Sequence, residues 1–410
     1  MEFLDSLVSD CLGGSSFFES NRRLYKFEKI KKLTNEVKIK NPNKPIIDMG
    51  VGEPDRMADL SISNILYQES QKLENRFYAD NGIVEFQEAA LRYMNNVFNI
   101  KDLNTSNVMH GIGSKSILAM IPICFINPGD ICLMPVPSYP TLGTYTKFLG
   151  GNVYTLPLCE ENNFLPDLDN IPENILKKSK MLYINYPNNP TGQVASYEFY
   201  KKVVDFAKKN NILVISDLAY GHLTYDGYKP LSIFCVEGSL DVCVEVHSLS
   251  KSFNMTGWRI GFIVGSNKFI KLFSTVKSHT DSGQFRAIQK AAAYALDNYC
   301  LVNDNIKRYS RRLDLLIDTL NEIGFNVKKP KGGFYVYAPI PKGTKGGIKF
   351  NTAEDASLYI LSHALVSTVP WDDCGSYLRF SVTYDSDTIN DEYLIMNELK
   401  NRLLSLNLIF

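Results

Sequence analysis

The sequence predicts an α/β protein with a large doubly wound α/β domain, whose sheet is mixed and mostly parallel, and a smaller α+β domain. Strand-like apolar runs alternate with helix-periodic segments over residues 117–270, the pattern of a sheet covered by helices on both faces. The chain has 410 residues, 45% of them hydrophobic, enough to fill two cores. We expect residues 1–60 to contribute to the small domain, 61–301 to form the large domain and 302–410 to form the carboxyl-terminal small domain.

Periodicity locates the individual elements. Apolar residues spaced three and four apart predict helices at residues 85–97, 117–125, 197–209, 303–323 and 353–365, and from about residue 387. Short apolar runs predict strands at 326–329 and 333–337 and around Arg379. Residues 343–350, rich in glycine and lysine, are predicted to form an exposed loop.

The most informative motif is Ser248-Leu249-Ser250-Lys251, with Arg259 eight residues beyond the lysine. A lysine that bonds covalently to an aldehyde must be able to lose its proton, so it needs a desolvated and partly cationic pocket. A guanidinium and hydroxyl groups are the usual partners of a phosphate. The motif therefore points to pyridoxal 5′-phosphate, although most lysines that follow two serines are ordinary surface residues.

Two further motifs follow predicted buried strands. Asn189-Pro190-Thr191-Gly192 comes after an apolar run, where open α/β sheets bind their ligands, although a plain turn is the alternative. Asp217 ends the strand-like run 212–217, and Tyr220 lies three residues beyond it. A carboxylate there can keep a pyridine nitrogen protonated, or it can cap a helix.

Three more features concern anions and rings. Gly111-Ile112-Gly113-Ser114-Lys115-Ser116 precedes a predicted helix, whose free amides would bind a phosphate; a dinucleotide fingerprint is excluded because its third glycine is absent. Tyr139 would stack on a ring or belong to the core. Arg379, in an otherwise apolar strand, needs an anion, either a substrate carboxylate or a structural Asp or Glu.

Taken in this order, the motifs resemble those of the fold-type I, class I/II aminotransferases of the aspartate aminotransferase superfamily, from about Gly50 to Thr383. The resemblance implies the fold type I of PLP-dependent transferases. It also implies that Lys251 bonds to the cofactor and carries the proton between the substrate Cα and the cofactor's C4′. Asp217 would pair with the pyridine nitrogen, and Asn189 and Tyr220 with the ring's phenolic oxygen.

The resemblance assigns the remaining roles as well. Ser114, Lys115, Ser248 and Arg259 would hold the phosphate, with Ser250 beside the lysine and Tyr139 stacked on the ring. Arg379 would bind the substrate α-carboxylate, with the backbone at Gly52 closing over it. Tyr78 would reach the phosphate of a neighbouring subunit's cofactor, which implies a homodimer with shared active sites.

For the substrate, the chain is most similar to the LL-diaminopimelate aminotransferases, in a divergent branch with Tyr-Ala-Asp-Asn-Gly at residues 78–82. The likeness is carried by residues 113–115, 247–261 and 281–284. The better-known branch has a glutamate in the loop that corresponds to 78–82; here the loop is shorter and offers Asp80. Because LL-diaminopimelate has a second amino-acid group, its far end needs partners, and the candidates are Asp80 and Ser282 from the neighbouring subunit and Trp371. Each could instead have a structural role in its loop.

The implied reaction converts LL-diaminopimelate and 2-oxoglutarate to tetrahydrodipicolinate and glutamate, and runs physiologically in reverse, towards lysine and peptidoglycan. Three alternatives stay open. One is an aminotransferase for aspartate, alanine or aromatic amino acids, and another is a PLP-dependent β-lyase, because the cofactor does not fix which bond breaks. The third is a ligand sensor, which would need a DNA-binding module, and the chain has no basic helix-turn-helix stretch before the domain.

Composition narrows the function further. Lys plus Arg equals Asp plus Glu at 44 each, which gives no support to nucleic-acid binding. Eight cysteines without a CxxC pair and five histidines without ligand spacing predict reduced thiols in a cytoplasmic enzyme and no metal. Residues 1–20 lack the apolar core of a signal peptide, and the longest apolar stretch, around 117–126, is too short to span a bilayer.

Overall fold

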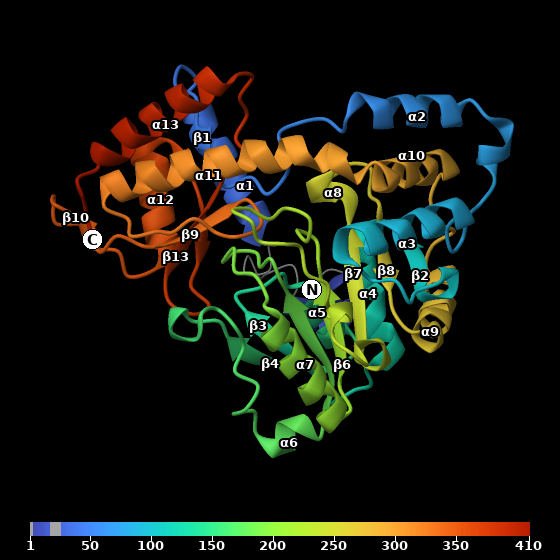
Figure 1. The fold of residues 1–410 in the computed structure, drawn as a ribbon. Coiled ribbons are helices and arrows are strands. Elements are labelled where there is room, and N and C mark those ends of the chain that lie inside the picture. Colours follow the sequence, from blue (N-terminus) through green and yellow to red (C-terminus); the bar gives the residue numbers. More distant parts are fainter. Residues whose placement is uncertain (1–2, 17–25) are drawn as a thin grey trace.

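The computed structural model describes residues 3–16 and 26–410, and a seven-stranded sheet forms the centre of its larger part (Figure 1). Residues 1, 2 and 17–20 of the segment considered above as a signal peptide lie outside the described residues. The strand order is β2-β8-β7-β6-β5-β3-β4. The strands are β2 (Val108–Gly111), β3 (Ile131–Val136), β4 (Asn152–Pro157), β5 (Ser179–Asn185), β6 (Leu213–Asp217), β7 (Cys243–Ser248) and β8 (Gly261–Val264).

β8 runs antiparallel to both of its neighbours, β2 and β7, and the other neighbouring strands pair in parallel. The predicted mixed and mostly parallel sheet is therefore confirmed. Successive residues of the central strands pack into different cores: Leu182 and Ile184 face one side of the sheet, and Met181 and Tyr183 face the other. Burial on both faces explains why these strands read as continuous apolar runs.

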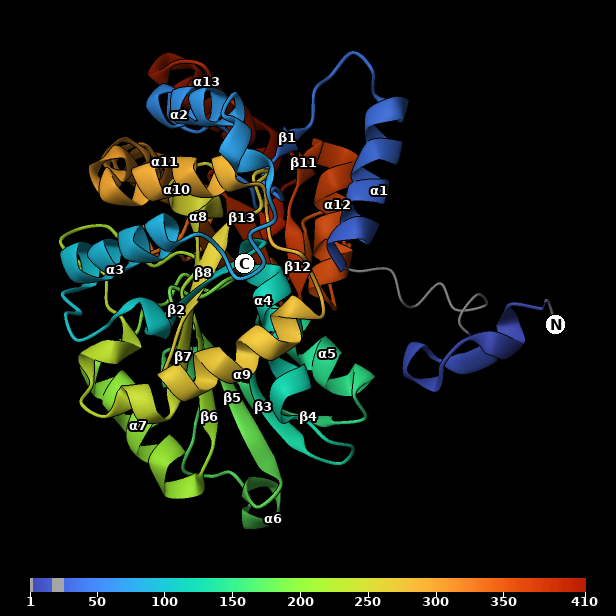
Figure 2. The same cartoon turned by 90° about the vertical axis from the view of Figure 1, so that its right-hand side faces the viewer.

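Helices cover both faces of this sheet (Figure 2). α4 (Gly113–Phe125) and α9 (Asn267–Ser278) share a core with Ile215 and Val246 on one face. α7 (Tyr197–Asn210) packs on the opposite face. The other helices of this part are α2 (Leu60–Ser70), α3 (Val84–Phe98), α5 (Thr141–Phe148), α6 (Glu173–Leu176), α8 (Leu249–Ser252) and α10 (Arg286–Asp297). The doubly wound arrangement that was predicted is therefore present.

A three-stranded antiparallel sheet lies in the carboxyl-terminal part, in the order β12-β13-β9. These strands are β9 (Tyr335–Pro339), β12 (Val369–Trp371) and β13 (Tyr377–Ser381), and the helices around them are α11 (Asn303–Ile323), α12 (Ala353–Ala364) and α13 (Ile389–Leu404). β1 (Ile47–Asp48) pairs in parallel with β11 (Val366–Ser367), and α1 (Lys26–Lys40) lies beside α12 (Figure 2). β1 and α1 thus pack with elements of the carboxyl-terminal part of the chain.

Short elements complete the description. β10 (Gly343–Thr344) pairs with β14 (Leu408–Ile409). The described 3-10 helices are Asp5–Leu7, Asp10–Leu12, Gly14–Ser16, Leu73–Arg76, Thr105–Asn107, Glu160–Asn162, Ile233–Cys235, Ser239–Asp241 and Tyr299–Val302. Over residues 3–16 and 26–410, no helix combines the length and the apolar character needed to cross a membrane.

The predicted helices are present, but three other predictions differ from the structure. Residues 326–329 form no strand, because the backbone of Val327 is bonded to the side chain of Asn321 at 2.9 and 3.1 Å. β9 begins at Tyr335 and not at residue 333, since Gly333 has φ +72° and donates its N–H to Leu223. The loop predicted at 343–350 begins with buried residues of β10, and only its middle is exposed.

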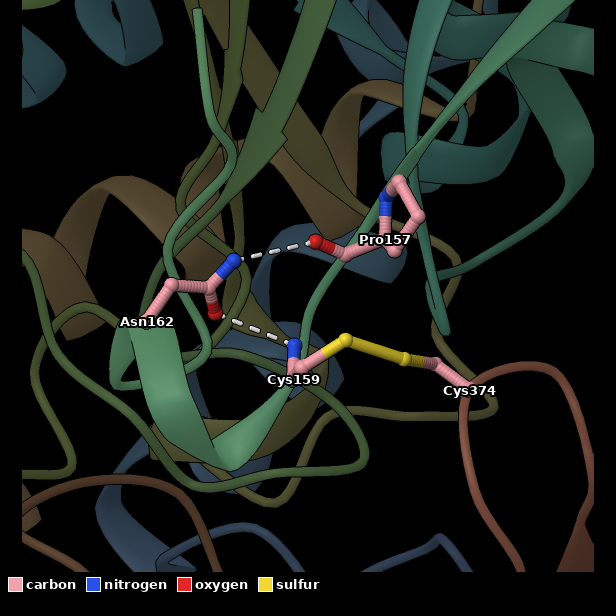
Figure 3. Close-up of a disulfide and its surroundings, with 4 residues drawn as sticks. All are labelled: Pro157, Cys159, Asn162 and Cys374. Carbon is pink, nitrogen blue, oxygen red and sulfur yellow. Dashed lines mark hydrogen bonds between the residues drawn. A yellow bond between two sulfur atoms is a disulfide. The ribbon is translucent and has the colours of Figure 1, made fainter.

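A disulfide between Cys159 and Cys374 corrects the expectation that all thiols are reduced (Figure 3). Cys159 follows β4, and Cys374 lies between β12 and β13, with Cα atoms 6.2 Å apart across 215 residues of sequence. The Asn162 side chain accepts from the Cys159 N–H at 3.0 Å and donates to the Pro157 carbonyl at 3.3 Å, which fixes the loop. The bond therefore links the edge of the seven-stranded sheet to the three-stranded sheet.

We expect removal of this bond to destabilise the protein. A cross-link over so long a separation restricts the unfolded chain, and its loss typically lowers the free energy of unfolding by about 2–4 kcal/mol. Denaturant unfolding of Cys374→Ser should show this loss, and a reductant should lower the midpoint of the wild type but not that of Cys374→Ser. Cys300→Ser, which removes an exposed free thiol, is the control. An unchanged wild-type midpoint in reductant would contradict the cross-link.

Candidate active site

A cavity of about 600 Å³ lies at the carboxyl ends of the parallel strands, where open α/β sheets bind their ligands. Strands β5, β6 and β7 end in Asn185, Asp217 and Ser248, which all line it, and β13 brings Arg379 from the smaller sheet. The residues predicted from the sequence that line this cavity are Gly52, Ser114, Lys115, Tyr139, Asn189, Asp217, Tyr220, Ser248, Ser250, Lys251, Arg259 and Arg379.

Lys251 lies on the short helix α8, directly after β7, and its Nζ donates to the Gly52 carbonyl at 2.7 Å. Burial lowers the pKa of Lys251 to about 8; the negative charge of Glu53 opposes this shift, and the charges of Arg379 and Arg259 reinforce it. Near neutral pH an appreciable fraction of the amine is therefore neutral. A neutral amine is the form that attacks an aldehyde and accepts a proton.

One end of the cavity is suited to a phosphate. Ser114 and Lys115 lie in the first turn of α4, whose free amides favour an anion, and Ser248 and Arg259 line the same cavity. Gly113 has φ +74°, and a Cβ atom at this position would collide with the guanidinium of Arg259. The glycine therefore lets the guanidinium reach the first turn of the helix. Amides, hydroxyls and a guanidinium together match a dianion.

Elsewhere in the lining, Asp217 offers a buried carboxylate. Its Oδ2 accepts from the Tyr183 hydroxyl at 2.7 Å, while the buried Oδ1 has no hydrogen-bond partner among the described residues. Burial raises the pKa of Asp217 to about 6, and the Tyr183 hydrogen bond opposes this shift. A cationic N–H donor would satisfy the free oxygen and favour the ionised form. Because an amine, this carboxylate and the phosphate-type site line one cavity, the residues present fit pyridoxal phosphate.

Arg379 is buried and held in one orientation. Its Nη1 donates to Asn189 Oδ1 and its Nη2 to the Gly50 carbonyl, both at 2.9 Å. The guanidinium lies 4.1 Å above the centre of the Tyr335 ring. Arg379 lines the cavity, and the planar fork of a buried guanidinium is suited to bind a carboxylate there.

Several lining residues were not predicted from the sequence. Tyr335 lies beneath Arg379, and its hydroxyl is 3.2 Å from that of Tyr220. The only signal for it was the pair Gly332-Gly333 just before, which allows close packing of the chain. Glu53, Asn185 and residues of α1, including Thr34 and Asn35, also line the cavity.

The remaining predicted site residues lie elsewhere. In the part of the chain that the structure describes, Tyr78, Asp80, Ser282 and Trp371 do not line the cavity. Trp371 was expected at the far end of the substrate. It is buried on β12, which packs against α12, and it does not line the cavity of its own chain. Tyr78 is 78% exposed, and Asp80 and Ser282 flank a bridge between Ala79 and Gly283. Their predicted roles concern a second subunit and stay predictions.

Comparison with known proteins gives consistent matches. The family model "Aminotransferase class I and II" matches residues 44–393, and members of that family use pyridoxal phosphate. The LL-diaminopimelate aminotransferase of Methanocaldococcus jannaschii is 49% identical over 417 aligned residues, which cover 100% of this chain and 99% of that protein. The LL-diaminopimelate aminotransferase of Methanococcus maripaludis is 46% identical, with coverage of 100% and 99%.

Solved structures agree with the fold. The structure of substrate-bound BacF from Bacillus subtilis superposes with a TM-score of 0.87 at 31% identity, covering 100% of this chain and 99% of that one. A Thermus thermophilus aspartate aminotransferase gives a TM-score of 0.81 at 23% identity, covering 93% and 97%. At this lower identity the likeness concerns the fold alone.

The lowered pKa of Lys251 can be measured directly in the cofactor-free protein. Because the amine is protonated below its pKa and reactive above it, labelling of Lys251 by an amine reagent should rise with a midpoint near pH 8. A lysine in a short peptide, with a pKa of about 10.4, is the reference. Arg379→Met should move the midpoint up and Glu53→Gln should move it down. A wild-type midpoint equal to that of the peptide would contradict the proposed environment.

Proposed function

Because this chain belongs to the class I and II aminotransferases, we propose that it is an LL-diaminopimelate aminotransferase that uses pyridoxal 5′-phosphate bound at Lys251. The observation that carries the proposal is the convergence of Lys251, Asp217 and Arg379 on one cavity. Full-length relatives with that name, at 46% and 49% identity, support the substrate. The reaction exchanges an amino group between LL-diaminopimelate and 2-oxoglutarate, and serves lysine and peptidoglycan synthesis in the reverse direction.

Each chemical task of this reaction falls to a residue of the cavity. When bound, pyridoxal phosphate supplies a reactive aldehyde and a ring that accepts electrons from the substrate Cα. Asp217 keeps the pyridine nitrogen protonated, and the first turn of α4 with Arg259 holds the phosphate. Lys251 takes the proton from the substrate Cα, a role that its lowered pKa permits.

Arg379 orients the amino acid. Its hydrogen bonds to Asn189 and Gly50 and its contact with Tyr335 fix the plane of the guanidinium before substrate arrives. A carboxylate that binds this fork in a bidentate manner places its Cα in a defined position, which lowers the entropy lost on reaching the transition state. Because Lys251 Nζ lies at the Gly52 carbonyl, two residues from Gly50, the same segment positions both groups.

The far end of LL-diaminopimelate needs partners beyond Arg379. Glu53, Thr34 and Asn35 line the cavity of the same chain. In a cytoplasmic homodimer with shared active sites, Asp80 and Ser282 of a second copy add an acidic and a hydroxyl group. The large exposed side chains of Tyr67, Leu73, Phe77 and Tyr78 support such a dimer, because a second copy can cover side chains of this kind.

The proposal is tested by mixing cofactor-loaded protein with LL-diaminopimelate in the absence of a keto acid and following the visible absorbance of the aldehyde form. The absorbance should fall, and 2-oxoglutarate should restore it. Alanine, aspartate and aromatic amino acids should leave it unchanged, and Lys251→Ala should show no response. A response to another amino acid alone would replace the substrate, and release of pyruvate and ammonia would indicate a β-lyase.

Arg379→Ala should weaken every amino-acid substrate alike. Loss of one partner from a buried, hydrogen-bonded charge pair reduces binding by about 2–5 kcal/mol, and both LL-diaminopimelate and glutamate carry an α-carboxylate. Steady-state kinetics should therefore show a large increase in KM for both substrates. Arg92→Ala, which removes an arginine paired with Asp297 away from the cavity, is the control. A loss confined to LL-diaminopimelate would place Arg379 at the far end of the substrate.

A further inference from the structure

A buried lysine outside the cavity holds the loop formed by residues 78–82. Lys277 lies on α9 and is 1% exposed. Its Nζ donates to the Asp80 backbone carbonyl at 2.6 Å and to the Asp281 carboxylate at 2.5 Å. The same carboxylate oxygen accepts from the Gly283 N–H at 2.8 Å. One ammonium group thus joins two segments that are 197 residues apart in sequence.

The two segments also fit closely through their backbones. Ala79 forms a parallel bridge with Gly283, which has φ +79°, and a Cβ at position 283 would collide with the Ala79 carbonyl. Burying an ammonium is unfavourable unless its donors are satisfied, and a buried ion pair contributes more to a specific arrangement than to stability. The arrangement that Lys277 specifies is the position of residues 78–82 against residues 281–283.

Further hydrogen bonds fix the loop before and after Asp80, the residue whose carbonyl Lys277 binds. Arg286 donates to the Tyr78 carbonyl through Nη2 at 2.7 Å and Nε at 3.3 Å. The Gln289 side chain accepts from the Ile83 N–H at 2.9 Å. The backbone of the loop is therefore held, while the side chain of Tyr78 is 78% exposed and that of Phe77 is 52% exposed. A fixed backbone with exposed rings presents those rings to a partner.

The cavity of the same chain does not use this arrangement. Over the described residues, its lining includes none of residues 77–83 or 277–289. Phe77, directly before the loop, and Tyr67 and Leu73, earlier in the sequence, are exposed. Together with the hydroxyl of Tyr78 and the carboxylate of Asp80, such side chains suit a contact with a second copy whose cavity takes a donor and an acceptor.

We propose that Lys277 is a positioning residue, which fixes residues 78–82 so that Tyr78 and Asp80 enter the active site of a second copy of this chain. This inference rests on the shared active sites of the proposed function. Tyr78 then contributes a hydroxyl at the phosphate end, and Asp80 a carboxylate at the far end of the substrate. Without the ammonium, the loop loses the hydrogen bond that Lys277 donates to the Asp80 carbonyl, and both groups lose their fixed place.

The first test is Lys277→Met, which keeps the length of the side chain and removes its donors. The dissociation constant of pyridoxal phosphate, measured by equilibrium dialysis, should rise about tenfold or more, and KM should rise more for LL-diaminopimelate than for glutamate. Lys271→Met, an exposed position on the same helix, is the control and should match the wild type. An unchanged dissociation constant in Lys277→Met would overturn the proposal.

A hybrid dimer separates this role from a merely structural one. Subunits with Lys277→Met and subunits with Lys251→Ala are given different affinity tags, co-expressed, and purified as mixed dimers. One site then combines an intact Lys251 with a loop held by an intact Lys277 of the other subunit. That site should bind the cofactor with the wild-type dissociation constant and respond to glutamate in the absorbance assay. A hybrid as weak as the Lys277→Met homodimer, or a monomeric wild type, would overturn the proposal.

A second variant covers the case in which Lys277→Met does not fold. Arg286→Gln removes the bonds to the Tyr78 carbonyl from a half-buried side chain, and it should weaken cofactor binding in the same direction and regain it in the same hybrid. Failure of that rescue would count against the proposal. Because cofactor binding and the response to glutamate involve no LL-diaminopimelate, an incorrect substrate assignment would leave this test valid.

Discussion

The buried guanidinium of Arg379 is the contact on which the rest of the site depends. It joins three parts of the chain, since β13 carries it, Asn189 after β5 accepts from Nη1, and Gly50 accepts from Nη2. Tyr335 on the neighbouring strand β9 supports its face and reaches Tyr220, which follows β6. A buried guanidinium in the lining of a cavity is suited to bind a carboxylate, so the contact that assembles the cavity also equips it for this group.

The same burial acts in opposite directions on the two central titratable groups. It lowers the pKa of Lys251 to about 8 and raises that of Asp217 to about 6, because a low-dielectric environment disfavours either charged form. Both values move towards neutrality, where a base can accept a proton and later return it. Asp217 retains one buried oxygen without a partner among the described residues, so a bound cation at that position would favour its ionised form. Apolar packing around the strand ends thus prepares both groups before any ligand binds.

Much of the site could be predicted because its residues occur in short motifs at the ends of apolar strands. The sequence places Asp217, Ser248 and Lys251 within or just after such runs, and parallel strands bring their carboxyl ends to one edge. Tyr335 could not be found in this way, since its role comes from β13 pairing with β9. Cys159 and Cys374 were equally hidden, because 215 residues separate them and no spacing rule links them. The strand prediction for residues 326–329 was wrong. The backbone of this segment bonds to the Asn321 side chain, and a partner of this kind leaves no pattern in the sequence.

Two buried, positively charged side chains connect early segments of the chain to later helices. Arg312 of α11 contacts Asp55 at 3.1 Å and Glu392 of α13 at 2.8 Å, which fixes the segment after Gly52 and hence the carbonyl that receives Lys251 Nζ. Lys277 of α9 fixes the loop at residues 78–82 by donating to the Asp80 carbonyl while it is paired with Asp281. Apolar pairs could fill these places with equal or greater stability, but they would not define the direction of a backbone carbonyl. Buried charges therefore orient two early segments of the chain. Arg312 orients the segment that faces the cavity of its own chain, and Lys277 orients the loop whose Tyr78 side chain lies at the surface.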